Sequence, residues 1–378
     1  MLRQFLNIVF REYDTRLYAL HRVELSKTLF YESTEVPKAE EVLKVEEVAK
    51  TDKNGGGWPP TFVNIDDLPR PEIFFSSQPA MINASKFHFF SLLPGQGEGC
   101  VLFANPSANV SVYDVDLQSV VAMPPASFPK PNNSIVLSIT NQCEWSSRGE
   151  YDLYVMSTHD GSFEFFNYCR TSMSAYPNDW YRRRLPYVPP CGPDSYYTVR
   201  PDSPPFAAAV VDNSTICASS NGGTYAFDIS RGVWRQLAGT WTLPFHGAAE
   251  YVPKFRLWFG LEGPNGSSQH RLCAFDLASA PTAEEAPASQ HSWDYLEGLP
   301  DEWYPSVRRL VNLGLGKFCI ATCCLHRPSP KEGDMEVVGD EVTVLTGVEV
   351  VREGNGLHMI KHKSLHYKLD NMGIHCVL

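Results

Sequence analysis

The stretch that decides the fold is FAAAVVDNSTICASSNGGTYAFDISRGVWRQL, residues 206–237. It contains four short runs of apolar or alternating residues, separated by the turn-forming residues Asp, Asn, Ser and Gly. We expect strands at 206–212, 215–220, 224–230 and 233–237, because β-branched and aromatic residues favour strands and these polar residues favour tight turns. Consecutive strands with such short connections predict one four-stranded antiparallel sheet.

The same order of strand-like runs recurs along the chain. An apolar residue followed by Pro marks most units, and successive markers lie 55, 62, 58 and 56 residues apart. This period is nearer to the roughly 50 residues of a kelch repeat than to the roughly 40 to 45 of a WD40 blade. Six such sets predict an all-β fold, a six-bladed kelch-like β-propeller of four-stranded antiparallel sheets, as a single domain over residues 1–378. The markers are Leu68-Pro69, Met123-Pro124, Leu185-Pro186, Leu243-Pro244 and Leu299-Pro300, and Leu93-Pro94 departs from the series.

Two further features recur between units. An aromatic residue and an Asp end the third strand at Phe227-Asp228, Phe275-Asp276 and Tyr113-Asp114, and we expect each Asp to accept hydrogen bonds from backbone amides of the next turn. Trp234 and Trp293 each stand three residues before a Leu. We expect both indole rings to be buried between neighbouring sheets, because a four-stranded sheet cannot bury both of its faces alone.

The two ends of the chain carry separate expectations. A closed propeller requires its last unit to meet its first, so residues 1–10 should lie close to residues 358–369. Residues 32–57, ESTEVPKAEEVLKVEEVAKTDKNGGG, are rich in Glu and Lys and end in three glycines. This composition predicts a disordered, charged loop inserted within the first blade.

Several segments carry a resemblance to known families. GGTYAFDISRGVWRQL at 222–237 resembles a kelch repeat, although only this unit keeps the pair of glycines. Over nearly its whole length the chain also resembles a plant family, abundant in grasses, known as domain of unknown function 1668. That resemblance implies no particular activity. The segments that carry it are 3–27 (RQFLNIVFREYDTRLYALHRVELSK), GGTYAFD, 241–261 (WTLPFHGAAEYVPKFRLWFGL), 310–321 (LVNLGLGKFCIA) and 345–352 (LTGVEVVR).

Composition excludes some kinds of partner. Lys and Arg number 32 against 43 Asp and Glu, which gives a net charge of −11 and disfavours nucleic acid and anionic membrane surfaces. The first residues form no signal peptide, and no apolar run is long enough to span a membrane. We therefore expect a cytoplasmic or nuclear protein. The ten cysteines include no CxxC pair, and we expect free thiols.

Two clusters could bind a metal. His358, His362 and His366 stand four residues apart, but the segment alternates polar and apolar residues and includes lysines, which favours a solvated strand face. Cys319, Cys323, Cys324 and His326 form the second cluster, but adjacent cysteines on a strand point to opposite faces. We predict no metal, no cofactor and no catalytic residue. Ser157 to Gly161 reads as a hairpin turn built on Asp-Gly.

Two classes of function remain open. The first is a non-catalytic protein-interaction scaffold that binds an unidentified protein partner through the loops of one face, and the alternative is an enzyme or small-molecule-binding propeller that uses the central channel. The candidate partner-binding residues are Trp303 and Tyr304 as aromatic anchors, and Arg182, Arg183 and Arg184 as a site for an acidic partner. The longer connections expected on that face are 70–84, 124–132, 187–203, 262–269 and 325–341.

Overall fold

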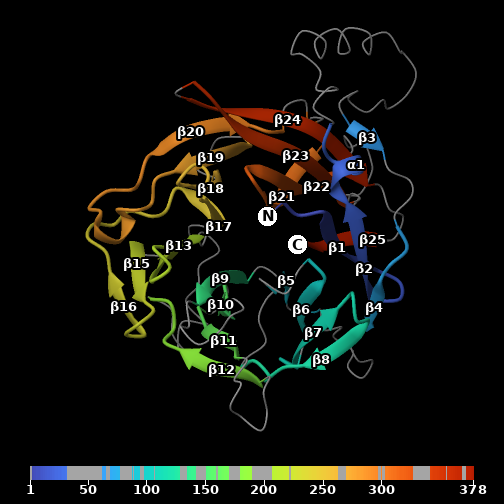
Figure 1. Cartoon of the computed structure of the whole chain (residues 1–378), viewed down its shortest axis with the longest axis horizontal. Coiled ribbons are helices and arrows are strands. Elements are labelled where there is room, and N and C mark those ends of the chain that lie inside the picture. The colour runs from blue at the N-terminus through green and yellow to red at the C-terminus, as the bar shows by residue number, and fades with distance from the viewer. Residues whose placement is uncertain are drawn as a thin grey trace, which may run out of the picture. The chain divides into compact units, whose positions relative to one another are not determined.

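The structure is a computed structural model of the chain, whose strands are labelled in Figure 1. By its contacts the chain divides into two compact units, which we describe separately: unit 1 is Met1–Ser76, Gln269–Leu272 and Trp293–Leu378, and unit 2 is Ser77–Ser268 and Cys273–Ser292. The single domain remains a prediction, and the predicted insert at 32–57 lies outside the described residues. Those residues are 2–31, 62–64, 69–76, 87, 89–93, 98–105, 107–127, 134–141, 150–158, 161–169, 179–189, 207–220, 223–262, 270–296, 299, 303–326, 341–354, 356–367 and 372–378.

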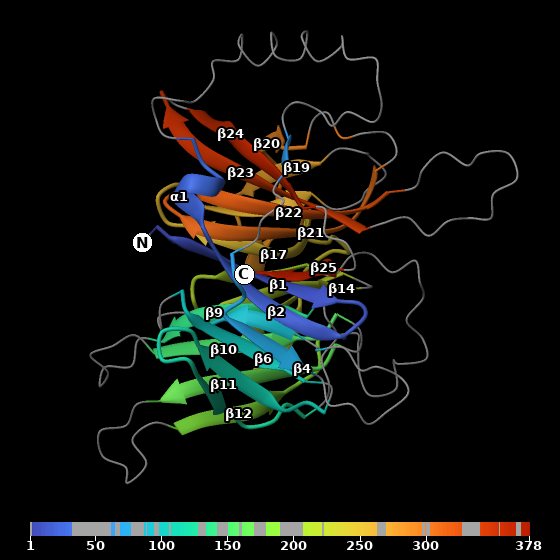
Figure 2. The same ribbon diagram turned by 90° about the vertical axis from the view of Figure 1, so that its right-hand side faces the viewer.

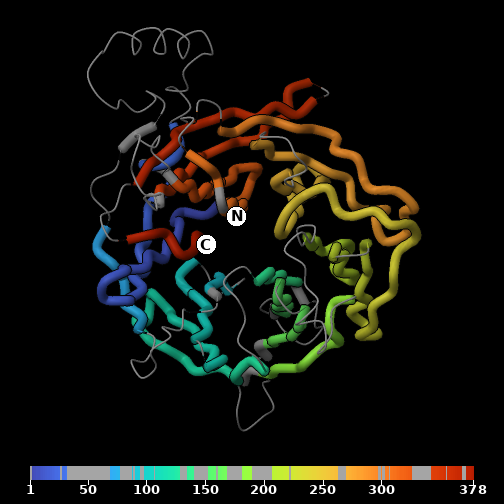
Figure 3. Tube along the Cα trace, turned by 180° about the vertical axis from the view of Figure 1, so that it is seen from behind, coloured from blue at the N-terminus to red at the C-terminus, as the bar shows by residue number. Residues whose placement is uncertain are grey.

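In unit 1 both ends of the chain contribute to one sheet, in the order β25-β1-β2-β4. Strand β1 pairs antiparallel with β2 on one side and with β25 on the other (Figures 1 and 3). The backbone of Leu378 exchanges two hydrogen bonds with that of Asn7, at 2.8 and 3.1 Å. The bounds are β1 (Phe5–Glu12), β2 (Leu17–Glu24), β4 (Ile73–Ser76) and β25 (Met372–Val377).

The second sheet of unit 1 has the order β21-β22-β23-β24-β3. Its first four strands form an antiparallel meander. β3 adds in parallel beside β24. The bounds are β3 (Phe62–Asn64), β21 (Trp303–Gly314), β22 (Lys317–His326), β23 (Glu341–Glu353) and β24 (Gly356–Tyr367).

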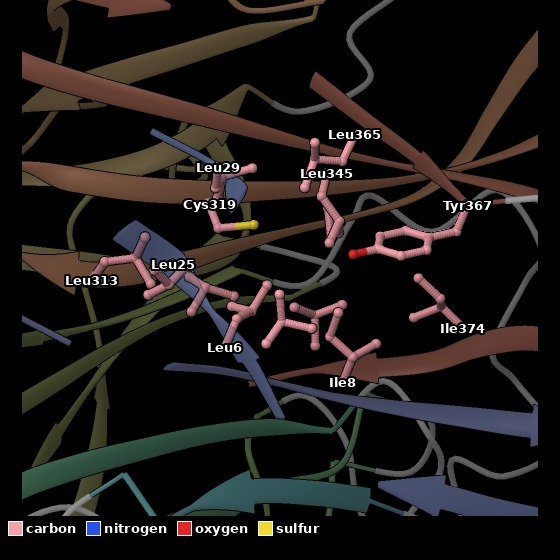
Figure 4. Close-up of a cluster of buried hydrophobic side chains, with 14 of the residues drawn as sticks. Leu6, Ile8, Leu25, Leu29, Leu313, Cys319, Leu345, Leu365, Tyr367 and Ile374 are labelled. Atoms are coloured by element: carbon pink, nitrogen blue, oxygen red, sulfur yellow. The ribbon is translucent and has the colours of Figure 1, made fainter. Parts of the chain in front are cut away.

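The core of unit 1 joins these two sheets (Figure 4). Leu6, Ile8 and Phe10 alternate along β1 and are almost fully buried, as expected for one face of a strand. They pack in one cluster with Leu365 and Tyr367 of β24, and the rings of Phe10 and Tyr367 lie 6.1 Å apart. The predicted meeting of the two chain ends is therefore confirmed.

Unit 2 contains two antiparallel four-stranded meanders, β5-β6-β7-β8 and β12-β11-β10-β9. Buried side chains of the first, such as Leu102 and Val112, share one cluster with Leu153 and Phe166 of the second. The bounds are β5 (Phe89–Leu92), β6 (Cys100–Ala104), β7 (Val110–Asp114), β8 (Ser119–Ala122), β9 (Ile135–Asn141), β10 (Glu150–Met156), β11 (Phe163–Cys169) and β12 (Asp179–Leu185).

The largest sheet has eight strands, in the order β16-β15-β14-β13-β17-β18-β19-β20. Three residues of β13, starting at Ala207, pair in parallel with β17, starting at Gly247, and this pairing merges two meanders. The four strands predicted within 206–237 are confirmed as β13 to β16. The bounds are β13 (Ala207–Val211), β14 (Thr215–Ser220), β15 (Gly223–Asp228), β16 (Val233–Gln236), β17 (Phe245–Val252), β18 (Leu257–Glu262), β19 (Arg271–Phe275) and β20 (Ser289–Asp294).

The fold is all-β, with a propeller-like arrangement of antiparallel sheets. The prediction of six separate four-stranded sheets is wrong, because the described residues form five sheets: three of four strands, one of five and one of eight. The parallel pairing of β13 with β17 and the addition of β3 account for the difference. Helix is confined, within the described residues, to α1 (Leu25–Thr28) and the 3-10 turn η2 (Ala280–Thr282). Neither helix is long and apolar enough to cross a membrane.

The predicted Asp turns are confirmed. Asp114 Oδ1 accepts hydrogen bonds from the backbone amides of Asp116 and Leu117, both at 3.0 Å. Asp228 Oδ1 accepts one from the amide of Arg231 at 3.0 Å, and Asp276 Oδ1 accepts one from Ala278 at 3.0 Å. The same side chain therefore closes equivalent turns in different sheets.

The predicted burial of the two Trp residues needs correction. Trp234 lies between two sheets, with its ring 5.6 Å from that of Phe163 and 5.0 Å from that of Phe227, and its Nε1 donates to the Pro186 carbonyl at 3.1 Å. It is nevertheless only half-buried, and so is Trp293. The reason is that β16 and β20 are the outermost strands of their sheet, so one side of each ring stays accessible.

Candidate functional site

Unit 1 contains a cleft of about 1030 Å³ beside β1. It extends from the residues that precede β1, past α1, to β22, β23 and β24. Residues from both ends of the chain therefore meet at one concave site, which we call the β1 cleft. Its lining residues are Leu2, Arg3, Gln4, Phe5, Glu24, Leu25, Phe30, Tyr31, Leu313, Lys317, Glu349, Val351, Ile360 and His362.

A glycine allows one wall of the β1 cleft to form. A Cβ added at Gly347 of β23 would lie 2.7 Å from the carbonyl oxygen of Leu29, so only Gly permits the segment after α1 to approach this closely. The Leu29 carbonyl also accepts a hydrogen bond from the Lys363 amide at 3.2 Å. These contacts place Phe30 and Tyr31 against β24.

A charged cluster lies beside this wall. Lys317 and Glu349 are cross-strand partners of β22 and β23, with Lys317 Nζ 3.5 Å from Glu349 Oε2. The same carboxylate oxygen lies 3.3 Å from His362 Nε2, and Lys317 Nζ also lies over the Phe30 ring, 4.7 Å from its centroid. Glu349 is thus shared by two partners.

His362 has both ring nitrogens engaged. The backbone amide of Tyr31 donates to Nδ1 at 3.3 Å, and because that amide can only donate, Nδ1 carries the lone pair and Nε2–H donates to Glu349. Burial lowers the pKa of His362, Lys317 and Lys363 lower it further, and Glu349 opposes them. The imidazole is therefore held in its neutral form.

The predicted solvated face of the three histidines is correct only for His358, which is exposed. His362 and His366 are 7% and 1% exposed, and the ring of Phe30 packs against that of His362, with centroids 4.9 Å apart. The His366 ring lies 5.4 Å from that of Trp303. Within the described part of the chain, no group of three or more potential metal ligands occurs.

The aromatic candidates for partner binding differ from each other. Trp303 is 6% exposed and packs inside unit 1, whereas its neighbour Tyr304 is 54% exposed. The Trp303 side chain is therefore part of the core, and the Tyr304 side chain is the one that a partner could contact. Both begin β21 of unit 1, whereas the arginine candidates belong to unit 2.

The three arginines lie on β12 with different partners. Arg182 Nη1 lies 3.1 Å from Glu164 Oε1 and donates to Ser127 Oγ, and Arg184 Nη2 donates to the Tyr187 hydroxyl at 2.9 Å. Arg183 is exposed. The connections predicted to share one binding face lie largely outside the described residues, so that face stays a prediction.

The profile of one known family, described as "Protein of unknown function (DUF1668)", matches residues 3–367. The chain belongs to this family. A search of curated proteins finds no match.

Solved structures that resemble this member of the family share little sequence with it. The β-propeller domain of Cps50 (Swd1) from Myceliophteria thermophila is 10% identical, with 95% of this chain and 98% of that chain covered and a TM-score of 0.38. A structural genomics protein of unknown function from Bacteroides thetaiotaomicron is 11% identical, with 63% and 55% covered and a TM-score of 0.35. The WD40 domain of SCAP from fission yeast is 12% identical, with 92% and 63% covered and a TM-score of 0.33. The chain thus spans 55% and 63% of the lengths of the latter two.

The buried cysteines of this chain are poorly suited to react as thiolates. Burial raises the pKa of Cys319 and of Cys217 to about 12, so their reactive thiolate forms are scarce near neutral pH. Cys324 is buried while Cys323 is half-buried, as expected for adjacent residues on opposite faces of a strand. Seven cysteines are free of disulfide bonds, as predicted: Cys100, Cys217, Cys273, Cys319, Cys323, Cys324 and Cys376.

Sequence reasoning missed the cluster of Lys317, Glu349 and His362. Each residue lies in a predicted strand, but their meeting depends on the register between β22, β23 and β24, including the shift between Thr346 and Val348. A Lys directly after the turn at residues 314–316 was the available signal, since a charged strand end commonly finds a cross-strand partner.

Proposed function

We propose that this protein is a kelch-like interaction scaffold without catalytic activity, and that its β1 cleft receives an apolar segment of a partner protein. The observation that carries the proposal is that Lys317, Glu349 and His362, three polar residues of the cleft lining, contact one another. Lys317 and His362 both contact the Glu349 carboxylate. These groups hold three strands together and offer no free acid, base or nucleophile to a substrate.

The remaining lining suits a protein segment. Seven of the lining residues are apolar and the others are polar. Protein interfaces combine apolar and polar residues in the same way. Leu25, Phe30 and Leu313 are themselves buried in the core. The cleft is therefore preorganised, which lowers the entropic cost of binding.

Local geometry supports the kelch-like character. Gly223, the second glycine of the kelch-like segment, has φ +129°, a conformation that residues with side chains rarely adopt. Trp234 stands directly opposite Phe227 across β15 and β16. We further propose that the partner is met in the cytoplasm or the nucleus, where free thiols such as those described here persist.

One observation favours a second candidate function, the binding of a small molecule in the same cleft. Its volume of about 1030 Å³ is at the upper end of the range of ligand pockets. A compact ligand should raise the melting temperature of the isolated protein when a metabolite extract freed of macromolecules is added. The scaffold hypothesis expects no such rise.

Photo-crosslinking tests the scaffold. A photoreactive benzoylphenylalanine at Leu2, which is 41% exposed and lines the cleft, should yield one discrete protein adduct in a cell extract. The same probe at Leu117, which is 74% exposed in unit 2, is the control. A second substitution, Ile360→Glu, places a charge in the cleft wall and should remove the Leu2 adduct while the melting curve confirms folding. Equal adducts from both probes, or an adduct that survives Ile360→Glu, would contradict the proposal.

A further inference from the structure

The basic edge of β12, residues 181–184, is a second surface of interest and does not depend on the β1 cleft. β12 is the last strand of the sheet β12-β11-β10-β9 and pairs, among the described strands, with β11 alone (Figure 2). Tyr181 is 59% exposed, and Arg183 and Arg184 are exposed beside it. An edge strand presents backbone groups that can pair with another strand.

The charge of this edge is opposite to that of the protein. The chain has a net charge of −11, yet three consecutive arginines stand on β12. At another edge strand, β8, the exposed side chains are the apolar Val120, Val121 and Ala122. Only an acidic strand would gain charge attraction along β12, so charge complementarity selects the occupant.

Two of the arginines are held in place before any partner arrives. Glu164 is 1% exposed and sits beside Arg182, whose own side chain remains 29% exposed. The Ser127 amide donates to the same Glu164 oxygen at 2.7 Å. The Arg184 guanidinium lies 5.6 Å from the centroid of the Tyr187 ring. This order reduces the entropy that binding would cost.

The pleat of β12 defines what the occupant needs. Tyr181 and Arg183 point to one face of the sheet, and Arg182 and Arg184 point to the other. In an antiparallel neighbour, residues directly opposite share a face. Two consecutive acidic residues would thus meet Arg184 and Arg183, and an aromatic residue two positions later would meet Tyr181.

We infer that β12 binds an extended acidic segment of a partner protein, which adds to the sheet as a further antiparallel strand. Main-chain hydrogen bonds supply affinity in this mode of recognition, and alternate side chains supply specificity. Glu164 contacts Arg182 and stands directly opposite Arg184 in the register, so Arg183, which points to the other face, carries most of the selection.

Synthetic peptides test the charge requirement. A fluorescein-labelled Thr-Glu-Glu-Thr-Tyr-Thr should bind the full chain, and its Gln-Gln analogue should bind at least about tenfold more weakly. Arg183→Glu should weaken binding of the acidic peptide by about tenfold. Arg256→Glu makes the same charge change at an exposed turn of the same unit, and it should change the affinity for this peptide by less than about twofold. Equal affinity of both peptides, or equal loss in both variants, would overturn the acidic specificity.

N-methylated peptides test the strand addition itself. Two versions of the acidic peptide carry N-methyl groups on alternate residues, so that only one version blocks the amides that face β12. We expect that version to bind at least about tenfold more weakly and the other to bind like the parent. If both versions bind like the parent, the segment does not add as a strand, even if the charge requirement holds. The β1-cleft variant Ile360→Glu should bind all peptides normally, which separates this inference from the proposed function.

Discussion

Glu164 and Glu349 are two strand glutamates that each contact a cation of the neighbouring strand, and their surroundings give them different roles. Glu164 on β11 is 1% exposed and accepts from both Arg182 and a backbone amide. Glu349 on β23 is 24% exposed at a cleft wall. The first carboxylate bonds the connection at Ser127 to its sheet, whereas the second contacts Lys317 and His362 at the wall of the β1 cleft.

Arg182 and Lys317, the cations that contact these two glutamates, also differ in their surroundings. The planar guanidinium of Arg182 reaches both the carboxylate and Ser127 Oγ, and an arginine keeps its charge when buried. Lys317 is a point charge that divides its contacts between Glu349 and the Phe30 ring. Burial and the number of contacts, more than the presence of an ion pair, therefore predict which glutamate matters for stability.

The largest effect is expected from Glu164→Ala. Removing the buried carboxylate leaves a guanidinium and an amide without their acceptor, which should cost about 3 kcal/mol of unfolding free energy. Glu349→Ala should cost about 1 kcal/mol, because solvent screens that pair. Urea unfolding measures both, with Glu285→Ala at an exposed position as the control. A larger loss for Glu349→Ala would reverse the comparison.

Gly347→Ala should disturb the cleft region alone. The new Cβ would clash with the Leu29 carbonyl oxygen and Cγ, at 2.7 and 2.8 Å, so the segment that carries Tyr31 must shift, at a cost of about 2 kcal/mol. NMR should show loss of the Tyr31 amide hydrogen bond to His362. Gly99→Ala controls for the added methyl group, because its Cβ would make only ordinary van der Waals contacts, the nearest at 3.5 Å, on a backbone that accepts a side chain. Unchanged Tyr31 and His362 signals in Gly347→Ala would contradict the close approach.

The pH dependence of the unfolding free energy should reveal the contribution of His362 in the β1 cleft. The folded pKa of His362 is below its ordinary value of 6.5, so the unfolded chain binds more protons between these two values. The contribution of His362 is complete above about pH 6.5 and is lost as the pH falls through the folded pKa. Comparing wild type with His362→Leu isolates it from His21 and His270, whose pKa values burial also lowers.

A charge at His362 would face Glu349 on β23, Lys317 on β22, Lys363 on its own strand and the Tyr31 amide. We expect acid to break the Tyr31 hydrogen bond first, because a protonated Nδ1 can no longer accept. His358→Leu at an exposed position of β24 is the control. A His362→Leu protein that loses as much stability as wild type between pH 6.5 and pH 5 would exclude this role.

Local patterns in the sequence predict individual strands well. The strand-like runs in 206–237 correspond to β13 to β16. The predicted turns at Asp114, Asp228 and Asp276 are also present. Both features depend only on neighbours within one hairpin. β25 was not foreseen. Its pairing partner β1 is more than 350 residues away in the sequence.

The candidate sites were harder to predict for the same reason. Arg182 reads as a surface charge until Glu164 and Ser127 are placed beside it. His362 reads as part of a solvated face until Phe30 and Tyr31, the residues after α1, are placed against its ring. Alternation along a strand does not reveal whether its polar face is covered, because covering elements come from distant sequence.

The smallest effect is expected from Lys317→Met. The ammonium contributes a screened ion pair and a cation–π contact at a half-buried position, together worth about 0.5 kcal/mol, and the Met side chain retains much of the apolar stem. The pKa of His362 should rise, because one cation that lowers it is gone. An NMR titration of the His362 ring measures this rise, and Lys254→Met at an exposed turn of unit 2 should leave the titration unchanged. If the His362 pKa stays constant while stability falls by several kcal/mol, Lys317 is a structural anchor like Arg182, and the difference between the two glutamate pairs does not hold.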